Sequence, residues 1–362
     1  MKPKRQKPND DHVEEDRLSN LPDSLLHHIL SFVDSDCAVQ TCILSTRWKN
    51  LWKHLPALKL NSSGFRYQKN FTNFVSRILS LRERSTTLHS LDFEHNRTAQ
   101  ARLLKRIVNY AISHNVQRLR INILCHFQHF PTCLFSCHTL TSLDLCVCYP
   151  TPFYGFLFPT SLDLPALTSL SLNSFKFCVG DDGRVDPFST LNCLNSLIIR
   201  NCSVHDHDAH NLCISSVTLV NLTIETYPGY YRKVELSTPS LCTFDFNCTG
   251  NVPALCGSDN DLSSVKHVNI NVMCSVNWTT EVSLALLSWL VELVNVKSLM
   301  ITSSTLKVLS WVPELSTIEF RSLCNLKLLK LKPRKGFPLS IPNGELSFLL
   351  QNSPSAKVEI IP

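Results

Sequence analysis

Short stretches of alternating apolar and polar residues recur at regular intervals along most of the chain. Each has apolar residues at its first, fourth and sixth positions. Ten stretches fit: Leu88/Leu91/Phe93, Val116/Leu119/Ile121, Leu140/Leu143/Leu145, Leu167/Leu170/Leu172, Leu194/Leu197/Ile199, Leu219/Leu222/Ile224, Leu241/Phe244/Phe246, Val265/Val268/Ile270, Val296/Leu299/Ile301 and Leu326/Leu329/Leu331. Because side chains alternate between the two faces of a strand, each stretch predicts one short strand with one buried face.

The ten stretches start 22 to 31 residues apart, which suits leucine-rich repeats, whose periods are about 20–29 residues. One repeat cannot bury its apolar face alone, so stacked neighbours make a continuous core and a curved parallel sheet. Leu55/Leu58/Leu60 fits as a degenerate eleventh repeat that ties the preceding residues to the others. We therefore predict an α/β protein with a solenoid of about ten repeats over residues 61–362.

The connections between the predicted strands differ in character. Apolar residues recur at helical spacing in four of them, which predicts helices on the convex side over 71–79, 104–112, 284–290 and 304–312. The connections 146–161 and 180–190 are rich in Pro, Gly and Asp, and they predict loops.

Residues 16–60 predict a separate module of three short helices. The first carries an apolar stripe from Leu25 to Val33, the second follows Asp36, and the third begins near Ser45 and carries Trp48. A bundle this small cannot hide so many large apolar side chains, so a partner is expected to cover the excess.

The same residues carry a resemblance to a known family. The stretches LPDSLLHHILSF at 21–32 and CILSTRWKNLW at 42–52 resemble the F-box in the version common in plants. With the repeats behind it, the chain is similar to the plant F-box/leucine-rich-repeat proteins, and the segments 320–331 and 349–354 are similar to that group as well. Many of these proteins continue into a further domain known as FBD, which we expect to be absent here.

The resemblance implies a non-catalytic function: the substrate-recognition subunit of an SCF-type E3 ubiquitin ligase. Its F-box would dock a Skp1-like adaptor and, through it, a cullin, while the repeats hold an unknown target protein. Carried over, the adaptor-binding residues are Leu21, Pro22, Leu25, Leu26, Ile29, Leu44 and Trp48. In a stripe this wide several of them, Ile29 especially, are alternatively internal core. The alternative function is a leucine-rich-repeat scaffold whose F-box docks nothing.

The polar positions between the strand leucines point to the concave face. The candidate target-binding residues there are Asp92, Arg120, Asp144, Arg200, Glu225 and Asp245. The face is rich in Asn and mixed in sign, which suits a protein held by many modest hydrogen bonds. A solvated face, with binding on the loops, is the alternative.

Other chemistries find little support. Glycine is rare, and the close pair Gly180 and Gly183 has neither dinucleotide-binding nor P-loop spacing. The Cys/His residues of 125–138 and of 205–210 fit no common zinc module, so we expect no metal and no cofactor. A metal-dependent hydrolase built on those clusters would require stoichiometric zinc. The net charge is +6 without a basic stripe interleaved with aromatics, which disfavours nucleic acid.

The N-terminal residues bear on the compartment. Residues 1–15 are charged and predict a disordered tail, in which Lys4-Arg5-Gln6-Lys7 is either a nuclear import signal or a solvated cluster. They lack the apolar segment of a secretory signal, and no apolar run is long enough for a membrane span. We expect a nuclear or cytoplasmic protein, not secreted, whose 16 Cys are small hydrophobes and not disulfides.

Overall fold

A computed structural model describes residues 18, 20–83, 86–125, 130–148, 156–180, 184–205, 211–227, 230–257, 261–273, 280–313, 315, 323–333 and 343–361. Its main feature is one sheet of twelve strands, and every neighbouring pair is parallel. In sheet order the strands are β1 (Ala57–Asn61), β2 (Ser90–Thr98), β3 (Arg118–Leu124), β4 (Ser142–Cys148), β6 (Ser169–Asn173), β8 (Ser196–Arg200), β11 (Asn221–Thr226), β13 (Thr243–Thr249), β15 (His267–Met273), β16 (Ser298–Thr302), β17 (Leu328–Lys332) and β18 (Lys357–Ile360).

The predicted repeats account for this sheet. All ten supply a strand, and the degenerate eleventh repeat supplies β1. The register aligns their apolar positions, as in Leu58, Leu91 and Leu119, which pair across β1, β2 and β3. Since the aligned side chains are buried, the core is a continuous ladder that runs the length of the sheet. β18 follows the last predicted repeat and was not foreseen.

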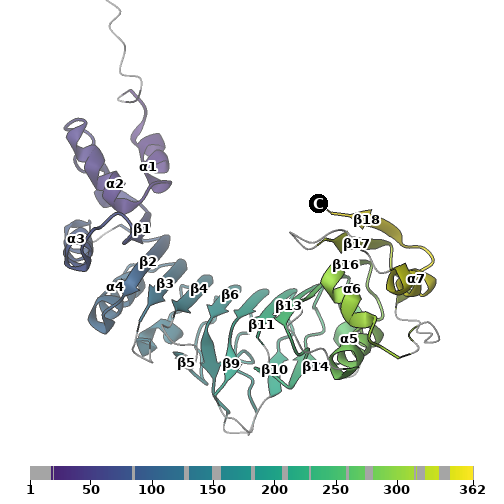
Figure 1. Cartoon of the computed structure of the whole chain (residues 1–362). Helices are drawn as coiled ribbons and strands as arrows, with labels where there is room; N and C mark the ends of the chain where they lie inside the picture. The colour runs from purple at the N-terminus through teal and green to yellow at the C-terminus, as the bar shows by residue number, and fades with distance from the viewer. Residues whose placement is uncertain are drawn as a thin grey trace, which may run out of the picture.

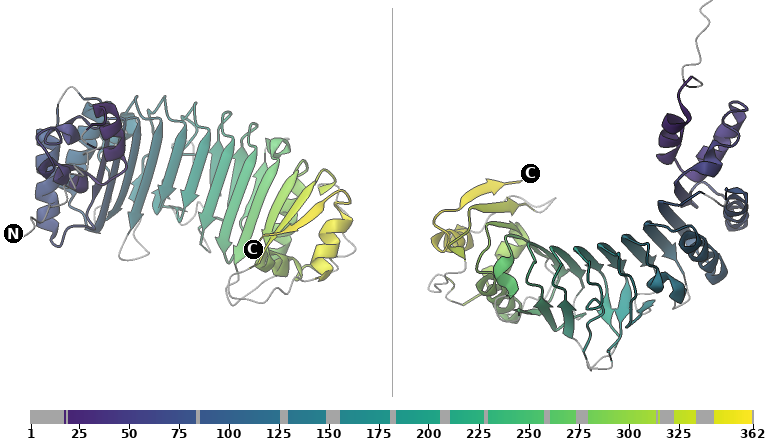
Figure 2. Two further views of the ribbon diagram at one scale, coloured as in Figure 1. Left: turned by 90° about the horizontal axis from the view of Figure 1, so that it is seen from above. Right: turned by 180° about the vertical axis from the view of Figure 1, so that it is seen from behind.

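The sheet is curved, and its twelve strands line the concave side (Figures 1 and 2). Near the N-terminal end the convex side is covered by α3 (Gln68–Leu81) and α4 (Ala101–Ser113), and near the other end by α5 (Thr280–Glu292). Two shorter helices complete that end: α6 (Ser303–Leu309) and α7 (Asn343–Gln351). Helices α3, α4 and α5 contain three of the four helical segments that the sequence predicts, and α6 covers the fourth, 304–312, only as far as Leu309.

Short strands take the place of helices on the middle of the convex side (Figure 1). They form two parallel three-stranded sheets: β5 (Phe156–Phe158), β7 (Phe175–Phe177) and β9 (Ser203–Val204), then β10 (Asn211–Ser215), β12 (Lys233–Ser237) and β14 (Ala254–Gly257). Buried phenylalanines fill the space behind the first of them; the ring centroids of Phe130 and Phe156, for example, are 4.7 Å apart. The prediction of a loop over 146–161 was therefore wrong in part, because β4 continues to Cys148 and β5 begins at Phe156.

The N-terminal module contains α1 (Asp23–Ser31), α2 (Ser35–Gln40) and two 3₁₀ helices, η1 (Thr41–Ile43) and η2 (Leu51–His54). Turns and η2 replace the third α-helix expected from Ser45. The module packs on the first strand of the sheet, where the backbone N–H of Lys59 donates to the hydroxyl of Ser35 at 3.0 Å. Among the described residues, no helix combines the length and the hydropathy needed to cross a bilayer.

Candidate interaction surfaces

The first candidate surface is the outer face of α1. Leu25 and Ile29 lie four residues apart and are exposed, Leu25 to 48% of its area. Leu26 and Leu30 lie one position later and are buried, so a single helix presents one apolar pair to the core and another to solvent. The prediction of Leu26 as an adaptor contact is therefore corrected: its exposed fraction is 0%, and it packs inside the chain.

The segment that follows α2 repeats this division. Leu44 is exposed, whereas Trp48 has an exposed fraction of 5% and lies in the core beside Leu51 and Trp52. Trp48 is thus a second correction, because a side chain already covered by its own chain adds no area to an interface. Of the remaining predicted contacts, Pro22 is exposed and Leu21 is half-buried.

Three exposed apolar side chains outside the predicted adaptor contacts lie next to these residues in the sequence. Ile43 is exposed to 85%, and Phe32 and Val33 follow directly after α1. The excess of apolar residues in so short a segment was the available signal, because the stripe from Leu25 to Val33 is too wide for one buried face. Exposed apolar patches on proteins commonly mark interaction sites, which makes these residues a candidate.

Arg47 fixes the shape of this surface by tying the turns after η1 to the start of α1. Its Nε donates to Oδ1 of Asp23 at 2.9 Å, and its Nη2 donates to the same carboxylate at 2.6 Å and to the carbonyl of Leu21. The planar guanidinium can hold two acceptors in one geometry. The segment that bears Leu44 is therefore held against α1.

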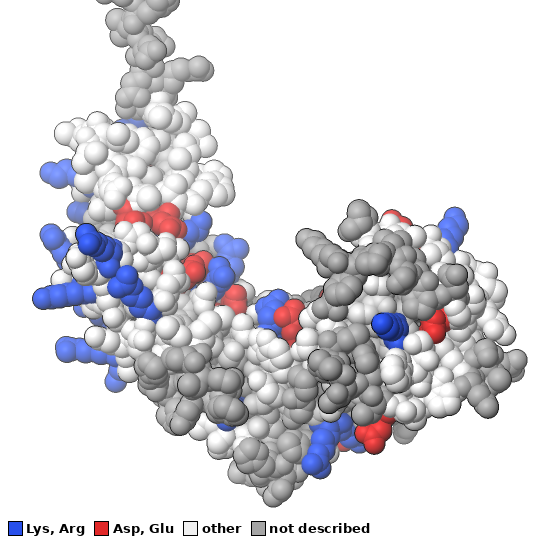
Figure 3. Space-filling view, in the orientation of Figure 1, with Lys and Arg blue, Asp and Glu red and all other residues white. Residues whose placement is uncertain are grey.

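The second candidate surface is the concave face of the sheet, where charged side chains form cross-strand ion pairs. Arg120 on β3 lies 3.4 Å from a carboxylate oxygen of Asp92 on β2 and 3.4 Å from one of Asp144 on β4. Further along, Arg200 and Glu225 pair across β8 and β11 at 3.2 Å. Figure 3 shows acidic and basic side chains side by side along this inner curve.

Asp245 on β13 is the exception among the predicted target-binding residues. It is half-buried, and no described residue forms an ion pair with its carboxylate. Burial raises the pKa of Asp245 above its usual value. Burial also raises the pKa of Asp92, although there the Arg120 guanidinium opposes the shift. The six predicted residues thus share one face, and five of them form ion pairs with one another.

Amide side chains share one concave row with Arg200 and Glu225. The sheet register brings Asn122, Cys146 and Asn173 into line across β3, β4 and β6, and Asn247 and Asn271 into line across β13 and β15. Most of these side chains are half-buried. Because each amide carries a hydrogen-bond donor and an acceptor, such a face offers both to a partner along its whole length.

The Cys/His residues weighed above are dispersed. His126, His129 and residues 206–210 lie outside the described residues. Cys125 and Cys137 are buried in the core, Cys133 donates to Oδ1 of Asn109 at 3.3 Å, and His138 pairs with Asp163 at 2.8 Å on the surface. In the part of the chain that the structure describes, no three His, Cys, Asp or Glu side chains converge as metal ligands would.

Comparisons with known proteins agree with this architecture. Residues 18–60 match the family model of the F-box domain. A putative F-box/FBD/LRR-repeat protein of Arabidopsis thaliana is 27% identical over 73% of this chain, a match that spans 62% of the relative's length. An F-box/LRR-repeat protein of the same plant is 26% identical over 95% of this chain and 91% of its own length. A putative FBD-associated F-box protein is 30% identical over 64% of this chain and 56% of its own.

Proposed function

From an N-terminal F-box joined to a leucine-rich-repeat solenoid, we propose that this chain is the substrate-recognition subunit of an SCF-type E3 ubiquitin ligase, acting in the nucleus or the cytoplasm. Its F-box binds a Skp1-like adaptor and thereby a cullin, and the concave face of the solenoid binds a target protein. The chain performs no chemistry: it raises the effective concentration of the target beside the ubiquitin-charged partner. We propose that the division between the adaptor-binding part and the target-binding part of the chain lies near residue 60.

The observation that carries the proposal is the exposed apolar surface formed by Leu25, Ile29, Ile43 and Leu44. These side chains come from two segments that Arg47 and Asp23 hold together. An exposed apolar cluster costs solubility unless a partner covers it. The match to the F-box model over the same residues supports a Skp1-like adaptor as that partner.

The test is binding of the full chain to a purified Skp1-like adaptor, measured by isothermal titration calorimetry. Leu25→Asp places a charge in the centre of the proposed interface, and we expect a loss of affinity of about a hundredfold or more. Leu284→Asp on α5 is the matched control, because Leu284 is also a helical leucine exposed to 48% but lies at the other end of the solenoid. That variant should bind like the wild type.

Two results would count against the proposal. Equal effects of the two substitutions would show that added charge, and not the F-box surface, governs binding. A folded wild-type chain that binds no adaptor would favour the alternative, a repeat scaffold with a non-functional F-box.

A further inference from the structure

Helices α3 and α4 carry an unbalanced positive charge. Their five exposed cations, called the basic face here, are Lys69, Arg77, Arg102, Lys105 and Arg106. Neither helix contains Asp or Glu. Figure 3 shows blue side chains gathered at the edge of the molecule where these helices lie, whereas α5 at the other end has Glu281 and Glu292 and no Lys or Arg.

The fold does not neutralise the basic face within the part of the chain that the structure describes. None of its five cations forms an ion pair with a described residue; Arg106 donates to the backbone carbonyl of Ser76 at 3.1 Å. Arg102 and Arg106 are four residues apart on one helix face, an arrangement that is destabilising for like charges. Lys69 and Arg102 also lie in the first turns of their helices, where the helix dipole disfavours a cation.

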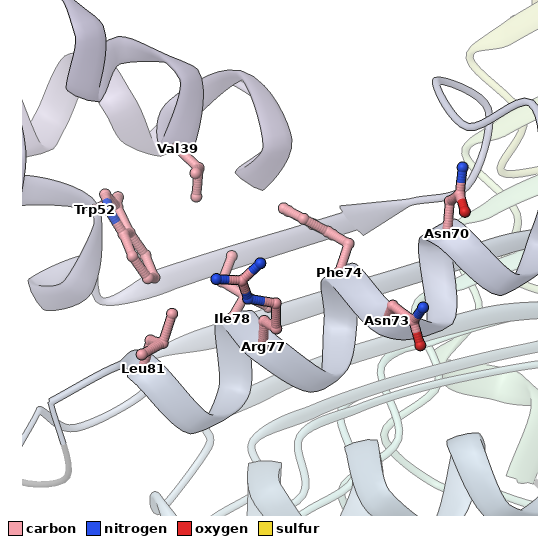
Figure 4. A pocket seen from close by; sticks show the side chains of 8 residues that line it. All are labelled: Val39, Trp52, Asn70, Asn73, Phe74, Arg77, Ile78 and Leu81. Atoms are coloured by element: carbon pink, nitrogen blue, oxygen red, sulfur yellow. The ribbon is translucent and has the colours of Figure 1, made fainter.

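An apolar groove of about 460 Å³ adjoins the basic face (Figure 4). Val39 and Trp52 of the F-box module form one wall, and Phe74, Ile78 and Leu81 of α3 form the other. Arg77 belongs to both features, because it lines the groove and is a member of the basic face. Figure 4 shows its guanidinium extending between Phe74 and the wall formed by Val39 and Trp52.

The groove and the exposed F-box surface share the α2–η1 segment. Val39 lies on α2, and Ile43 follows it by one helical turn in η1, exposed to 85%. A partner that covers Ile43 therefore lies about one helical turn from Val39 in the groove wall, and Arg77 lines the same groove.

We propose that the adaptor contact extends beyond the F-box: an acidic segment of the adaptor places an aliphatic or aromatic side chain in the groove and pairs its carboxylates with the basic face. The inference rests on the proposed function and adds α3 and α4 to the interface. A protein segment fits better than nucleic acid, because Trp52 is buried and Phe74 is half-buried in the groove walls, so neither ring offers a free face for a base to stack on.

The test compares adaptor binding by the full wild-type chain and by the double variant Arg77→Glu/Arg106→Glu, at about 50 and about 300 mM salt. Charge reversal at a complementary interface should lower the affinity about tenfold or more at low salt and weaken its dependence on salt. Lys266→Glu/Lys297→Glu is the matched control, with the same change in net charge on exposed lysines of the distant repeats. It should retain the wild-type affinity.

A second variant separates the groove from the charges. Leu81→Ser removes apolar area from a half-exposed side chain of the groove wall, and it should lower the affinity equally at both salt concentrations.

Each remaining outcome has one meaning. Wild-type affinity and salt dependence in the Arg77/Arg106 variant would overturn the inference and leave the proposed function standing. A wild-type chain that binds no adaptor would overturn both. If the variant instead loses only its retention by a single-stranded RNA, poly(U), the basic face belongs to nucleic acid and the inference is wrong.

Discussion

The side chain of Arg82, directly after α3, donates a hydrogen bond from Nε to the hydroxyl of Tyr110 on α4, 3.1 Å away. Its Nη1 and Nη2 donate to the backbone carbonyls of Trp52 and Leu55, at 3.4 and 2.5 Å. The guanidinium is buried, and burial lowers the pKa of Arg82 from its usual value. None of the described carboxylates forms an ion pair with it. One side chain thus joins the F-box module to the first two repeats.

We predict that Arg82→Met destabilises this joint by about 2–4 kcal/mol. Methionine fills much of the volume but leaves two buried carbonyls without a donor, each of which costs about 1–3 kcal/mol. Hydrogen exchange should rise over 51–60 while the distant repeats stay protected, because repeat proteins open locally. Arg106→Met, on the exposed face of α4, serves as the control; a joint that stays protected in Arg82→Met would contradict the prediction.

The corrected positions in the F-box module lead to a second prediction. Trp48→Ala and Leu26→Ala each remove a buried side chain and should lower the stability of the module by about 2–5 kcal/mol. Leu25→Ala removes an exposed side chain and should leave the stability within about 0.5 kcal/mol of the wild type. Limited proteolysis of the N-terminal module would measure the difference. Equal resistance of all three variants would show that Trp48 and Leu26 are not core residues.

His95 on β2 predicts a loss of stability in weak acid. Its ring is buried against Phe71, and burial lowers the pKa of His95 below its usual value of 6.5. The folded state therefore favours the neutral ring. The contribution of the His95 side chain to the free energy of unfolding is complete above about pH 6.5 and is lost as the pH falls below that value.

The measurement for His95 is a comparison of melting temperatures at pH 5.0 and 7.5. His95→Phe should show a smaller difference between the two values than the wild type. Because burial also lowers the pKa of His27 on α1, part of the pH dependence should remain. An unchanged difference in His95→Phe would exclude His95 as a source.

Asp245 gives a prediction of opposite sign. Burial raises the pKa of Asp245 above 3.8, so the folded chain is penalised when the carboxylate ionises. The penalty is absent below about pH 3.8 and grows as the pH rises through the raised pKa. Asp245→Asn should therefore be slightly more stable than the wild type at pH 7.5, with the gap closing toward pH 4. Urea titrations at both pH values would measure it, and a less stable variant at pH 7.5 would contradict the argument.

The sequence predicted the main sheet well because two periodicities coincide in it: side chains alternate within each strand, and the strands recur along the chain. Leu58 is one example, since its place in the pattern alone identified β1. The pattern failed for β18, whose residues are exposed, including Val358 and Ile360. It also missed β5 and β7, although Phe-x-Phe at 156–158 and at 175–177 was a usable strand signal.

The interaction surfaces were harder to predict because they depend on distances that the sequence does not show. The difference between Leu25 and Leu26 is one step of about 100° around a helix, and only the packing of α1 decides which of them is covered. Arg77 and Arg106 are 29 residues apart in the chain, and they adjoin because two successive repeats stack side by side. A scan for local basic runs cannot detect such a surface.

The position of β1 has a further consequence. This strand ends the segment that matches the F-box and begins the twelve-stranded sheet, so the described chain has no hinge between the proposed docking end and the proposed target face. β13, which bears Asp245, lies seven strands from β1, or about 34 Å at about 4.8 Å per strand. The number of repeats would therefore set the distance between the adaptor and a bound target. An added or deleted repeat would move the target by about one strand spacing and so change which of its lysines lies close to the ubiquitin-charged partner.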